Sequence, residues 1–193
     1  MFPLNLPNAL TLVRILLVPV LVVALTVETP GGDTIAAIVF AVAAFTDGLD
    51  GYIARSRQSV TTFGKVMDPV ADKLMVAAAL ISLVSLDRLA AWVAMVIIAR
   101  EFAVSGLRIA AGQQGVVIPA SGLGKGKTIV QVLAVLALIA ANDPDAMWVQ
   151  ALVYLMVAIT VASGADYFLN FRKKIEEAAR ERRAAAATAG RQR

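Results

Sequence analysis

The stretches DGLDGYIAR (residues 47–55) and GKVMDPVAD (residues 64–72) bring four aspartates into a short part of the chain. The sequence on both sides of this part is almost wholly apolar. A single carboxylate near the centre of a membrane helix costs roughly 2.5 to 3.5 kcal/mol, so four of them require a compensating cation. The cluster therefore indicates a functional site, made by Asp47, Asp50, Asp68 and Asp72.

The composition indicates a membrane protein. Of the 193 residues, 59% are hydrophobic, and the mean hydropathy is +0.76, whereas soluble domains are about 45 to 50% apolar. The chain has no cysteine and no histidine, which excludes disulfides and thiolate metal sites and removes the commonest general base. Any chemistry must therefore use carboxylates, Lys, Arg, Ser, Thr or Tyr. We expect an all-α integral membrane fold.

Spanning helices need about 20 mostly apolar residues. Such runs predict six transmembrane helices, at residues 6–26, 34–54, 69–86, 89–110, 127–141 and 147–170. The first run lacks a basic leader and a cleavage site, so we expect it to be retained. The fifth is short, and we expect it to extend N-terminally through residues 122–126. We divide the chain into a catalytic membrane domain, residues 1–172, and a basic tail, residues 173–193, which we expect to fray near Ala185.

The basic residues predict the orientation. They gather after the second, fourth and sixth spans, whereas the other three connections hold only Arg88. Because positive charge marks cytoplasmic loops, both termini and the aspartates are expected on the cytoplasmic side of the cell membrane. The tail should attract anionic lipid headgroups.

The spacing of the aspartates points to a metal site. Asp47 and Asp50 are spaced i, i+3, and Asp68 and Asp72 are spaced i, i+4, so each pair shares one helix face. The segment between the pairs is long enough to turn the chain and bring the two faces together. Oxygen ligands without imidazole or thiolate suit Mg²⁺ or Mn²⁺, with Ca²⁺ a possible substitute. Two ions about 3.5 to 4 Å apart could share four acids.

The neighbouring residues suit a diphosphate. Small side chains let a ligand approach the backbone closely, and they occur here at Gly51, Ala54 and Gly64. Arg55 adds a planar fork suited to phosphate oxygens. The pocket is therefore expected to hold a metal-bound diphosphate.

The full pattern resembles the signature of a known family. It reads Asp-x-x-Asp-Gly-x-x-Ala-Arg, eight residues, then Gly-x-x-x-Asp-x-x-x-Asp, and it resembles that of the CDP-alcohol phosphotransferases, membrane enzymes of phospholipid synthesis. The resemblance implies a six-helix fold, usually a homodimer, with the site facing the cytoplasm. It also implies that Asp47, Asp50 and Asp68 are metal ligands and that Asp72 is a ligand or the catalytic base. By the same resemblance the cytidine diphosphate site is lined by Asp47, Asp50, Gly51, Ala54, Arg55 and Gly64.

Within the family, other local sequences are most similar to the branch that uses sn-glycerol 3-phosphate. They are LPNALTLVR (6–14), TDGLDGY (46–52), FGKVMDPVADK (63–73), ARE (99–101) and GKGKT (124–128). The implied reaction is attack by the primary hydroxyl of that acceptor on the β-phosphorus of CDP-diacylglycerol, with release of CMP.

The acceptor carries its own phosphate, so a second cationic site is expected. Arg108, Lys125 and Lys127 fall in one predicted cytoplasmic connection, although topology-setting charge explains them as well. Arg100 lies beside Glu101 inside the fourth span, where adjacent charges imply partners in the bundle. It is either half of a structural ion pair or an acceptor contact. Thr61 is a further candidate for the acceptor phosphate.

One face of the first span carries polar residues at a period of three, namely Asn8, Thr11 and Arg14. These residues are candidates for contacting the CDP headgroup. Arg14 could instead snorkel to the membrane interface.

Two alternatives stay open. Another acceptor in the same family, such as inositol phosphate, serine or phosphatidylglycerol, would leave the metal and nucleotide chemistry unchanged. A divalent-cation transporter would explain the carboxylates but not the spacing of the Gly, Ala and Arg residues between them. The residues flanking the cluster, 35–45 and 74–84, are also too apolar for an ion path. No nucleic-acid partner is expected.

Overall fold

The computed structural model describes residues 6–27, 29–57, 62–113, 115–116 and 122–191. Within these ranges it describes the backbone alone for residues 6–8, 47–57, 62–69, 72, 125 and 181–191. The described part consists of helices without strands, which confirms the all-α prediction. The helices are α1 (Leu6–Thr26), α2 (Gly32–Arg57), α3 (Thr62–Ser85), α4 (Ala91–Gln113), α5 (Gly122–Ala140) and α6 (Met147–Arg191).

The predicted spans coincide with these helices, and the differences lie at their ends. Helix α1 has the predicted bounds, and α5 begins at Gly122, as its expected extension required. Helix α3 begins seven residues earlier than the predicted span, at Thr62, because the charged start of the helix was not counted as apolar. We had predicted that Arg108, Lys125 and Lys127 lie in one connection, and this is wrong. Arg108 lies within α4, and Lys125 and Lys127 lie within α5.

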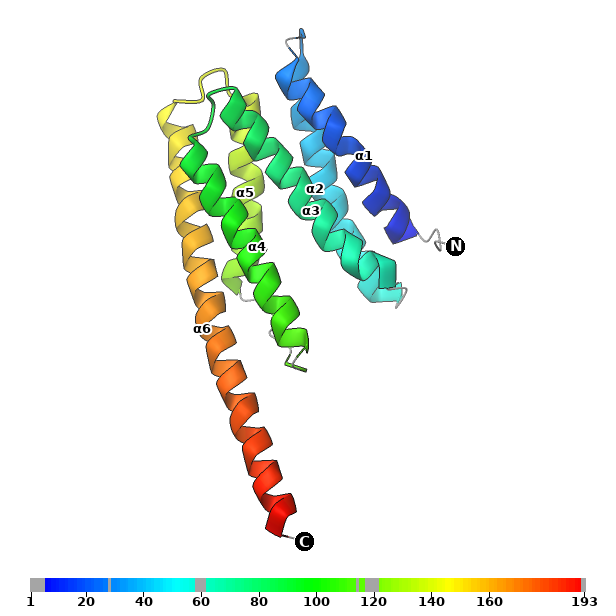
Figure 1. Ribbon diagram of the computed structural model, residues 1–193. Coiled ribbons are helices and arrows are strands. Elements are labelled where there is room, and N and C mark those ends of the chain that lie inside the picture. Colours follow the sequence, from blue (N-terminus) through cyan, green and yellow to red (C-terminus); the bar gives the residue numbers. More distant parts are fainter. Residues whose placement is uncertain (1–5, 28, 58–61, 114, 117–121, 192–193) are drawn as a thin grey trace.

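The helices alternate in direction along the bundle (Figure 1). The connections α1–α2, α3–α4 and α5–α6 lie at one end, and the last turns of α2 and α4 lie at the other, together with the first turns of α1, α3 and α5. We call the second end the motif end, because the predicted aspartate motif flanks its α2–α3 connection. The first is called the opposite end. All the basic clusters predicted from the sequence thus belong to the motif end.

The opposite end is closed by an ion pair and a sharp turn. Arg88 donates from Nη2 to Oδ2 of Asp33 at 2.8 Å and from Nη1 to the carbonyl of Ile139 at 3.3 Å. This side chain thereby ties the α3–α4 connection to the start of α2 and the end of α5. Asp87, just before it, has a φ of 57°, a left-handed conformation that aspartate tolerates better than most residues.

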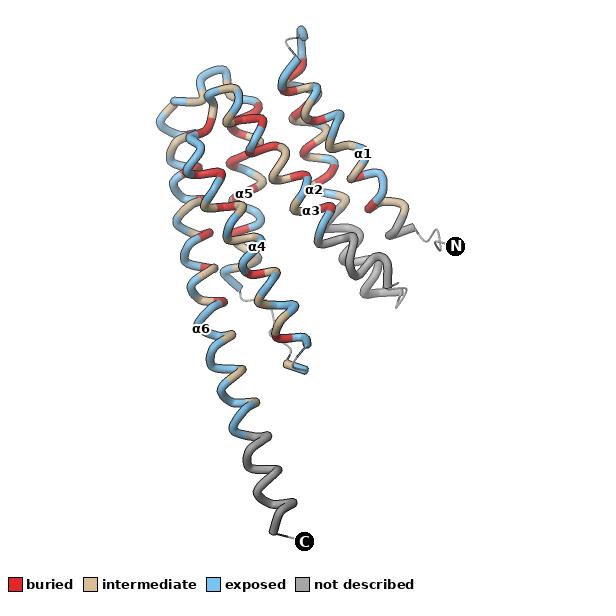
Figure 2. The backbone as a smooth tube through the Cα atoms, viewed as in Figure 1, coloured by how far each residue is buried: buried red, intermediate tan, exposed pale blue. Residues whose placement is uncertain are grey.

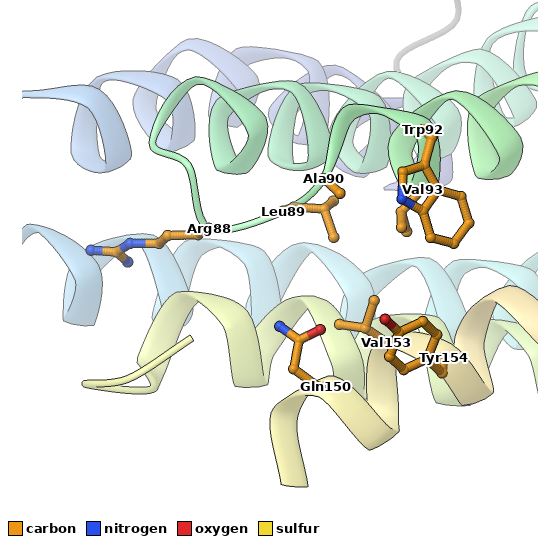
Figure 3. A pocket seen from close by; sticks show the side chains of 8 residues that line it. All are labelled: Arg88, Leu89, Ala90, Trp92, Val93, Gln150, Val153 and Tyr154. Atoms are coloured by element: carbon orange, nitrogen blue, oxygen red, sulfur yellow. The ribbon is translucent and has the colours of Figure 1, made fainter. Parts of the chain in front are cut away.

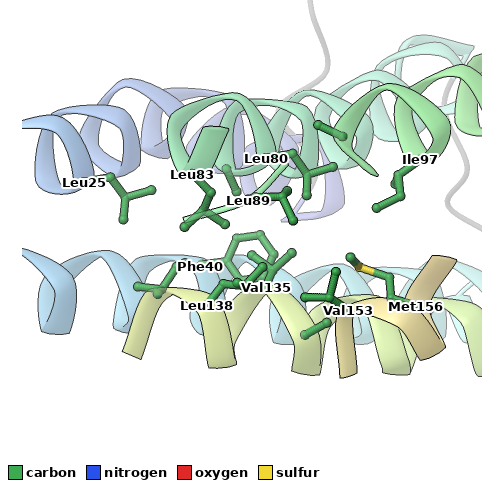
Figure 4. Close-up of a cluster of buried hydrophobic side chains, with 14 of the residues drawn as sticks. Leu25, Phe40, Leu80, Leu83, Leu89, Ile97, Val135, Leu138, Val153 and Met156 are labelled. Atoms are coloured by element: carbon green, nitrogen blue, oxygen red, sulfur yellow. The ribbon is translucent and has the colours of Figure 1, made fainter. Parts of the chain in front are cut away.

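Every helix contributes to one apolar core. Figure 4 shows its side chains converging in two layers, with Leu80, Leu83 and Ile97 facing Phe40, Leu138 and Met156. Several of the buried positions in Figure 2 are alanines. Small residues let membrane helices approach closely, and dispersion contacts drive that packing because lipid is as apolar as the core.

Outward-facing positions carry large apolar side chains. Leu16, Phe45, Met95 and Ile109 are each more than 60% exposed, which is the reverse of a soluble protein surface. By length and composition, three helices of the described part can cross a membrane, with windows at Ala9–Thr26, Gly122–Ala140 and Met147–Arg180. Gly32–Thr46 and Lys73–Ser85 form shorter apolar stretches. The chain is a membrane protein, and its six crossings stay a prediction.

Helix α6 leaves the bundle at the motif end as one continuous helix (Figure 1). It runs 45 residues to Arg191, past Ala185, where we had expected the helix to fray. Alanine, glutamate and arginine are strong helix formers, and they make up most of this segment. The pairs Arg172–Glu176 (2.9 Å) and Lys174–Glu177 (3.2 Å) support it at helical spacing.

Candidate active site

The aspartate motif falls on two consecutive helices that meet at the motif end. The last part of α2 carries Asp47, Asp50, Gly51, Ala54 and Arg55, and the first part of α3 carries Gly64, Asp68 and Asp72. Both carboxylate pairs therefore lie on helical backbone, as their spacing predicted. The side chains of these eight residues are outside the described ones, and so is Thr61 as a whole. The ligand set therefore stays a prediction.

Helix α1 packs against both helices of the motif. Thr11 and Arg14 are 1% and 2% exposed, so both lie inside the bundle. Arg14 does not snorkel to the membrane surface, as we had allowed, because its place on the helix faces neighbouring protein and not lipid. A guanidinium buried in this way has to be compensated by polar or charged neighbours. The side chain of Asn8 is outside the described set.

Charged side chains of α4 and α5 meet in the middle of the bundle. Oε1 of Glu101 accepts hydrogen bonds from Nη1 of Arg100 at 3.2 Å and from Nζ of Lys127. The side chain of Lys127 is 7% exposed and that of Glu101 is 14% exposed, so this contact is shielded from water. Lys73 of α3 also acts electrostatically on Glu101. We call Arg100, Glu101 and Lys127 the charged triad.

The triad extends to α6. Nη2 of Arg100 donates to Oγ of Ser163 at 3.0 Å, and Ser163 donates in turn to the carbonyl of Thr160 at 3.2 Å. The next residue, Gly164, makes room for the arginine, because a Cβ there would lie 3.2 Å from its Cγ. The ion pair that we had considered for Arg100 and Glu101 is present. Through Lys127 and Ser163, the two residues link α4 to α5 and to α6. Nothing in the local sequence pointed to Ser163 or Gly164 as its partners.

Arg108 is arranged differently from the triad cations. It is exposed on α4 two turns closer to the motif end, and its Cζ lies 5.8 Å from the centroid of the Tyr167 ring on α6. No described carboxylate forms an ion pair with it. Of the cations proposed for the acceptor phosphate, Lys125 has no described side chain, and the other two belong to the triad. Arg108 is thus the exposed candidate among the described side chains.

The described side chains hold no other site of comparable chemistry. A hollow of about 60 Å³ opens at the opposite end, between the start of α4 and the start of α6 (Figure 3). It is far smaller than the roughly 300 Å³ of the smallest usual ligand pockets. Among the described side chains, no three acidic groups cluster as metal ligands would, and the four predicted ligands all lie outside that set.

Comparisons with known proteins cover most of the chain. A family model described as CDP-alcohol phosphatidyltransferase matches residues 4–162, which run from α1 into α6. A Bacillus subtilis (strain 168) protein named CDP-diacylglycerol–glycerol-3-phosphate 3-phosphatidyltransferase is 42% identical over 180 residues, covering 85% of this chain and 93% of its own length. A Rickettsia felis protein of the same name is 36% identical, with coverage of 88% and 96%.

A third relative bears a different name. A Mycobacterium tuberculosis (strain H37Rv) protein named probable phosphatidylglycerophosphate synthase is 41% identical over 169 residues, covering 84% of this chain and 79% of its own length. The family match ends inside α6. The tail therefore lies outside what the chain shares with the family model.

Proposed function

Because the chain belongs to the CDP-alcohol phosphatidyltransferase family, we propose that it transfers the phosphatidyl group of CDP-diacylglycerol to sn-glycerol 3-phosphate. The products would be phosphatidylglycerophosphate and CMP, as in phospholipid biosynthesis. The observation that carries this proposal is the 42% identity to the Bacillus subtilis relative over 85% of the chain. That similarity covers far more than the aspartate motif, so it supports the acceptor as well as the family.

The reaction is a displacement at phosphorus. The primary hydroxyl oxygen of glycerol 3-phosphate forms a bond to the β-phosphorus of CDP-diacylglycerol. The bond from that phosphorus to the bridging oxygen breaks, and CMP leaves with the electron pair. The hydroxyl proton passes to the carboxylate of Asp72, a role that the resemblance of the motif implies. Positioning and electrostatic stabilisation supply most of the catalysis in such transfers.

The donor set of the motif suits a hard divalent cation. Enzymes of the family generally depend on such a metal, and four carboxylates without imidazole or thiolate match Mg²⁺ or Mn²⁺. When bound, two such ions would neutralise the diphosphate and stabilise the leaving CMP. Asp47, Asp50, Asp68 and Asp72 hold the ligand oxygens at the ends of α2 and α3. Gly51, Ala54 and Gly64 leave room for the nucleotide, and Arg55 binds its phosphate oxygens.

The structure supports a division of labour among the acceptor candidates. We assign the acceptor phosphate to Arg108, because its side chain is exposed and lies two helical turns closer to the motif end than the charged triad. Lys125 and Thr61 stay further candidates for contacting that phosphate. Arg100 and Lys127 are held by Glu101 inside the bundle, which supports a bracing role for both. The burial of Thr11 and Arg14 against the motif helices supports a place for α1, with Asn8, at the headgroup end of the site.

The distribution of basic and apolar residues also supports an orientation in the membrane. We propose that the motif end faces the cytoplasm, since the opposite-end connections hold only Arg88 among basic residues. The exposed apolar faces of the helices would contact membrane lipid and, in a homodimer, a second copy.

An acceptor assay tests the proposal. Purified protein receives CDP-diacylglycerol, Mg²⁺ and, in parallel, glycerol 3-phosphate, inositol phosphate, serine or phosphatidylglycerol, and CMP release is measured. We expect release with glycerol 3-phosphate. If inositol phosphate is used and glycerol 3-phosphate is not, the proposed acceptor is wrong. Metal flux without CMP release would favour a cation transporter.

The same assay with Asp50→Ala tests the metal site. We expect a loss of about 10²- to 10³-fold or more in turnover, because the diphosphate would face uncompensated charge. Without metal, the variant should unfold at a temperature no lower than wild type, since one repelling carboxylate is gone. Turnover close to that of wild type would reject the site.

A further inference from the structure

Helices α4 and α6 share a second, small core toward the motif end. Val104 and Ala111 of α4 and Tyr167 of α6 are buried in it, and Phe171 packs against them one turn further along α6. Tyr167 is only 4% exposed. Its ring is therefore held in one place by the surrounding side chains.

The exposed guanidinium of Arg108 lies over this fixed ring, 5.8 Å from its centroid. A cation within about 6 Å of a ring face is attracted by the negative charge of the π system. A guanidinium is planar and can stack on a ring while its N–H edge stays available to an oxyanion. The ring contact thus fixes the direction of Arg108 without occupying its hydrogen-bond donors.

The hydroxyl of Tyr167 plays no part in this contact. It is buried and has no hydrogen-bond partner in the part of the chain that the structure describes. A buried hydroxyl without a partner does not stabilise the fold. The feature that acts on Arg108 is the face of the ring.

From this arrangement we propose that Tyr167 is a positioning residue for the acceptor phosphate, acting through Arg108. The inference rests on the proposed function, which assigns that phosphate to Arg108. An exposed arginine samples many rotamers, and fixing it when a ligand binds costs conformational entropy. The ring restricts Arg108 before the phosphate arrives, so less entropy is lost on binding and the acceptor binds more tightly. The reacting centre and the nucleotide site are not affected.

Four variants in the CMP-release assay test the role of the ring. Tyr167→Leu removes the ring, and we expect its KM for glycerol 3-phosphate to rise about two- to fivefold, the range for an exposed cation–π contact. Its kcat and its KM for CDP-diacylglycerol should not change. Tyr167→Phe keeps the ring and should keep the wild-type KM. Tyr167→Met gives the same readout as Tyr167→Leu should the latter fail to fold. Phe171→Leu is the matched control, because it removes a ring from the same core without touching the cation.

A double-mutant cycle isolates the pair. In an Arg108→Met background, which keeps the aliphatic stem and removes the charge, Tyr167→Leu should raise the KM no further. A persisting effect there, or an equal rise of KM in Phe171→Leu, would reduce Tyr167 to a packing residue and overturn the inference.

The assay also separates this inference from the function on which it rests. Lack of turnover of glycerol 3-phosphate by the wild type would overturn both. Wild-type turnover together with an unchanged KM in Tyr167→Leu and Tyr167→Met would overturn the inference alone.

Discussion

Glu101 is the residue that joins separate helices through charge. It pairs with Arg100 on its own helix and with Lys127 of α5, and Arg100 reaches Ser163 of α6. All three triad side chains are at most 15% exposed, so water does little to screen them. One carboxylate thus contacts two cations in a place where burying an isolated cation would be costly.

The triad gives a prediction for stability. Glu101→Gln leaves both cations without their carboxylate, and we expect the free energy of unfolding to fall by about 3 to 5 kcal/mol. The double variant Glu101→Gln with Lys127→Met should recover part of this loss, because it also removes one of the two buried cations that Glu101 contacts. Denaturant unfolding in detergent measures both. The control is Glu176→Gln, which breaks an exposed pair of α6 and should cost at most about 1 kcal/mol.

Two helical glycines differ in the space around them. A Cβ at Gly164 would lie 3.2 Å from Cγ of Arg100, whereas one at Gly106 would meet nothing within 4 Å. We expect Gly106→Ala to be neutral or to stabilise by up to about 1 kcal/mol through helix propensity. Gly164→Ala should be about 1 to 3 kcal/mol less stable than Gly106→Ala, because it crowds the arginine. Equal melting temperatures for the two variants would contradict this reading of the contact.

At the level of elements, α6 has two parts with different surroundings. Its first part packs against α4 and α5 and ends with Tyr167 and Phe171 in the second core. Beyond Phe171, the ion pairs of the described side chains run along the helix itself, as in Arg172–Glu176 and Lys174–Glu177. The boundary that we drew at residue 172 from the sequence stays a prediction, and Phe171, which packs in the second core, comes directly before it.

Truncation tests that boundary. A chain that ends at residue 175 keeps the second core, and we expect it to fold and release CMP at close to the wild-type rate. A chain that ends at residue 166 lacks Tyr167 and Phe171. It should unfold at a lower temperature, because α4 loses the two aromatic side chains that pack against it in the second core. Strong loss of activity in the longer chain would show that the tail belongs to the catalytic domain.

In the whole molecule, the alternation of the helices gathers most of the basic residues at one end. The aspartate motif and Arg108 lie on helix segments that end or begin at the motif end, and α6 continues past that end into the tail (Figure 1). The Arg88–Asp33 pair joins the α3–α4 connection to the start of α2, at the opposite end. A membrane protein sorted in this way is expected to place its basic end in the cytoplasm.

Cysteine labelling checks this orientation, and the natural chain has no cysteine to interfere. Asp145→Cys lies in the exposed α5–α6 turn, and Gln113→Cys lies at the exposed end of α4. In intact cells, a thiol reagent that cannot cross the membrane should label residue 145 and not residue 113. Permeabilised cells should be labelled at both positions. The reverse pattern would place the motif end outside.

Local patterns in the sequence were sufficient for the helices, the family and the metal-site hypothesis. Apolar runs and the fixed spacing of Asp47 to Asp72 depend only on neighbours along the chain, and the family match confirmed the resemblance they indicated. The partners of the cations, in contrast, were decided by tertiary structure. Lys127 and Arg108 looked alike in sequence, yet one is paired with a residue 26 positions away and the other lies over a ring on α6. Such partners come from helices that are distant in sequence, and only packing brings them together.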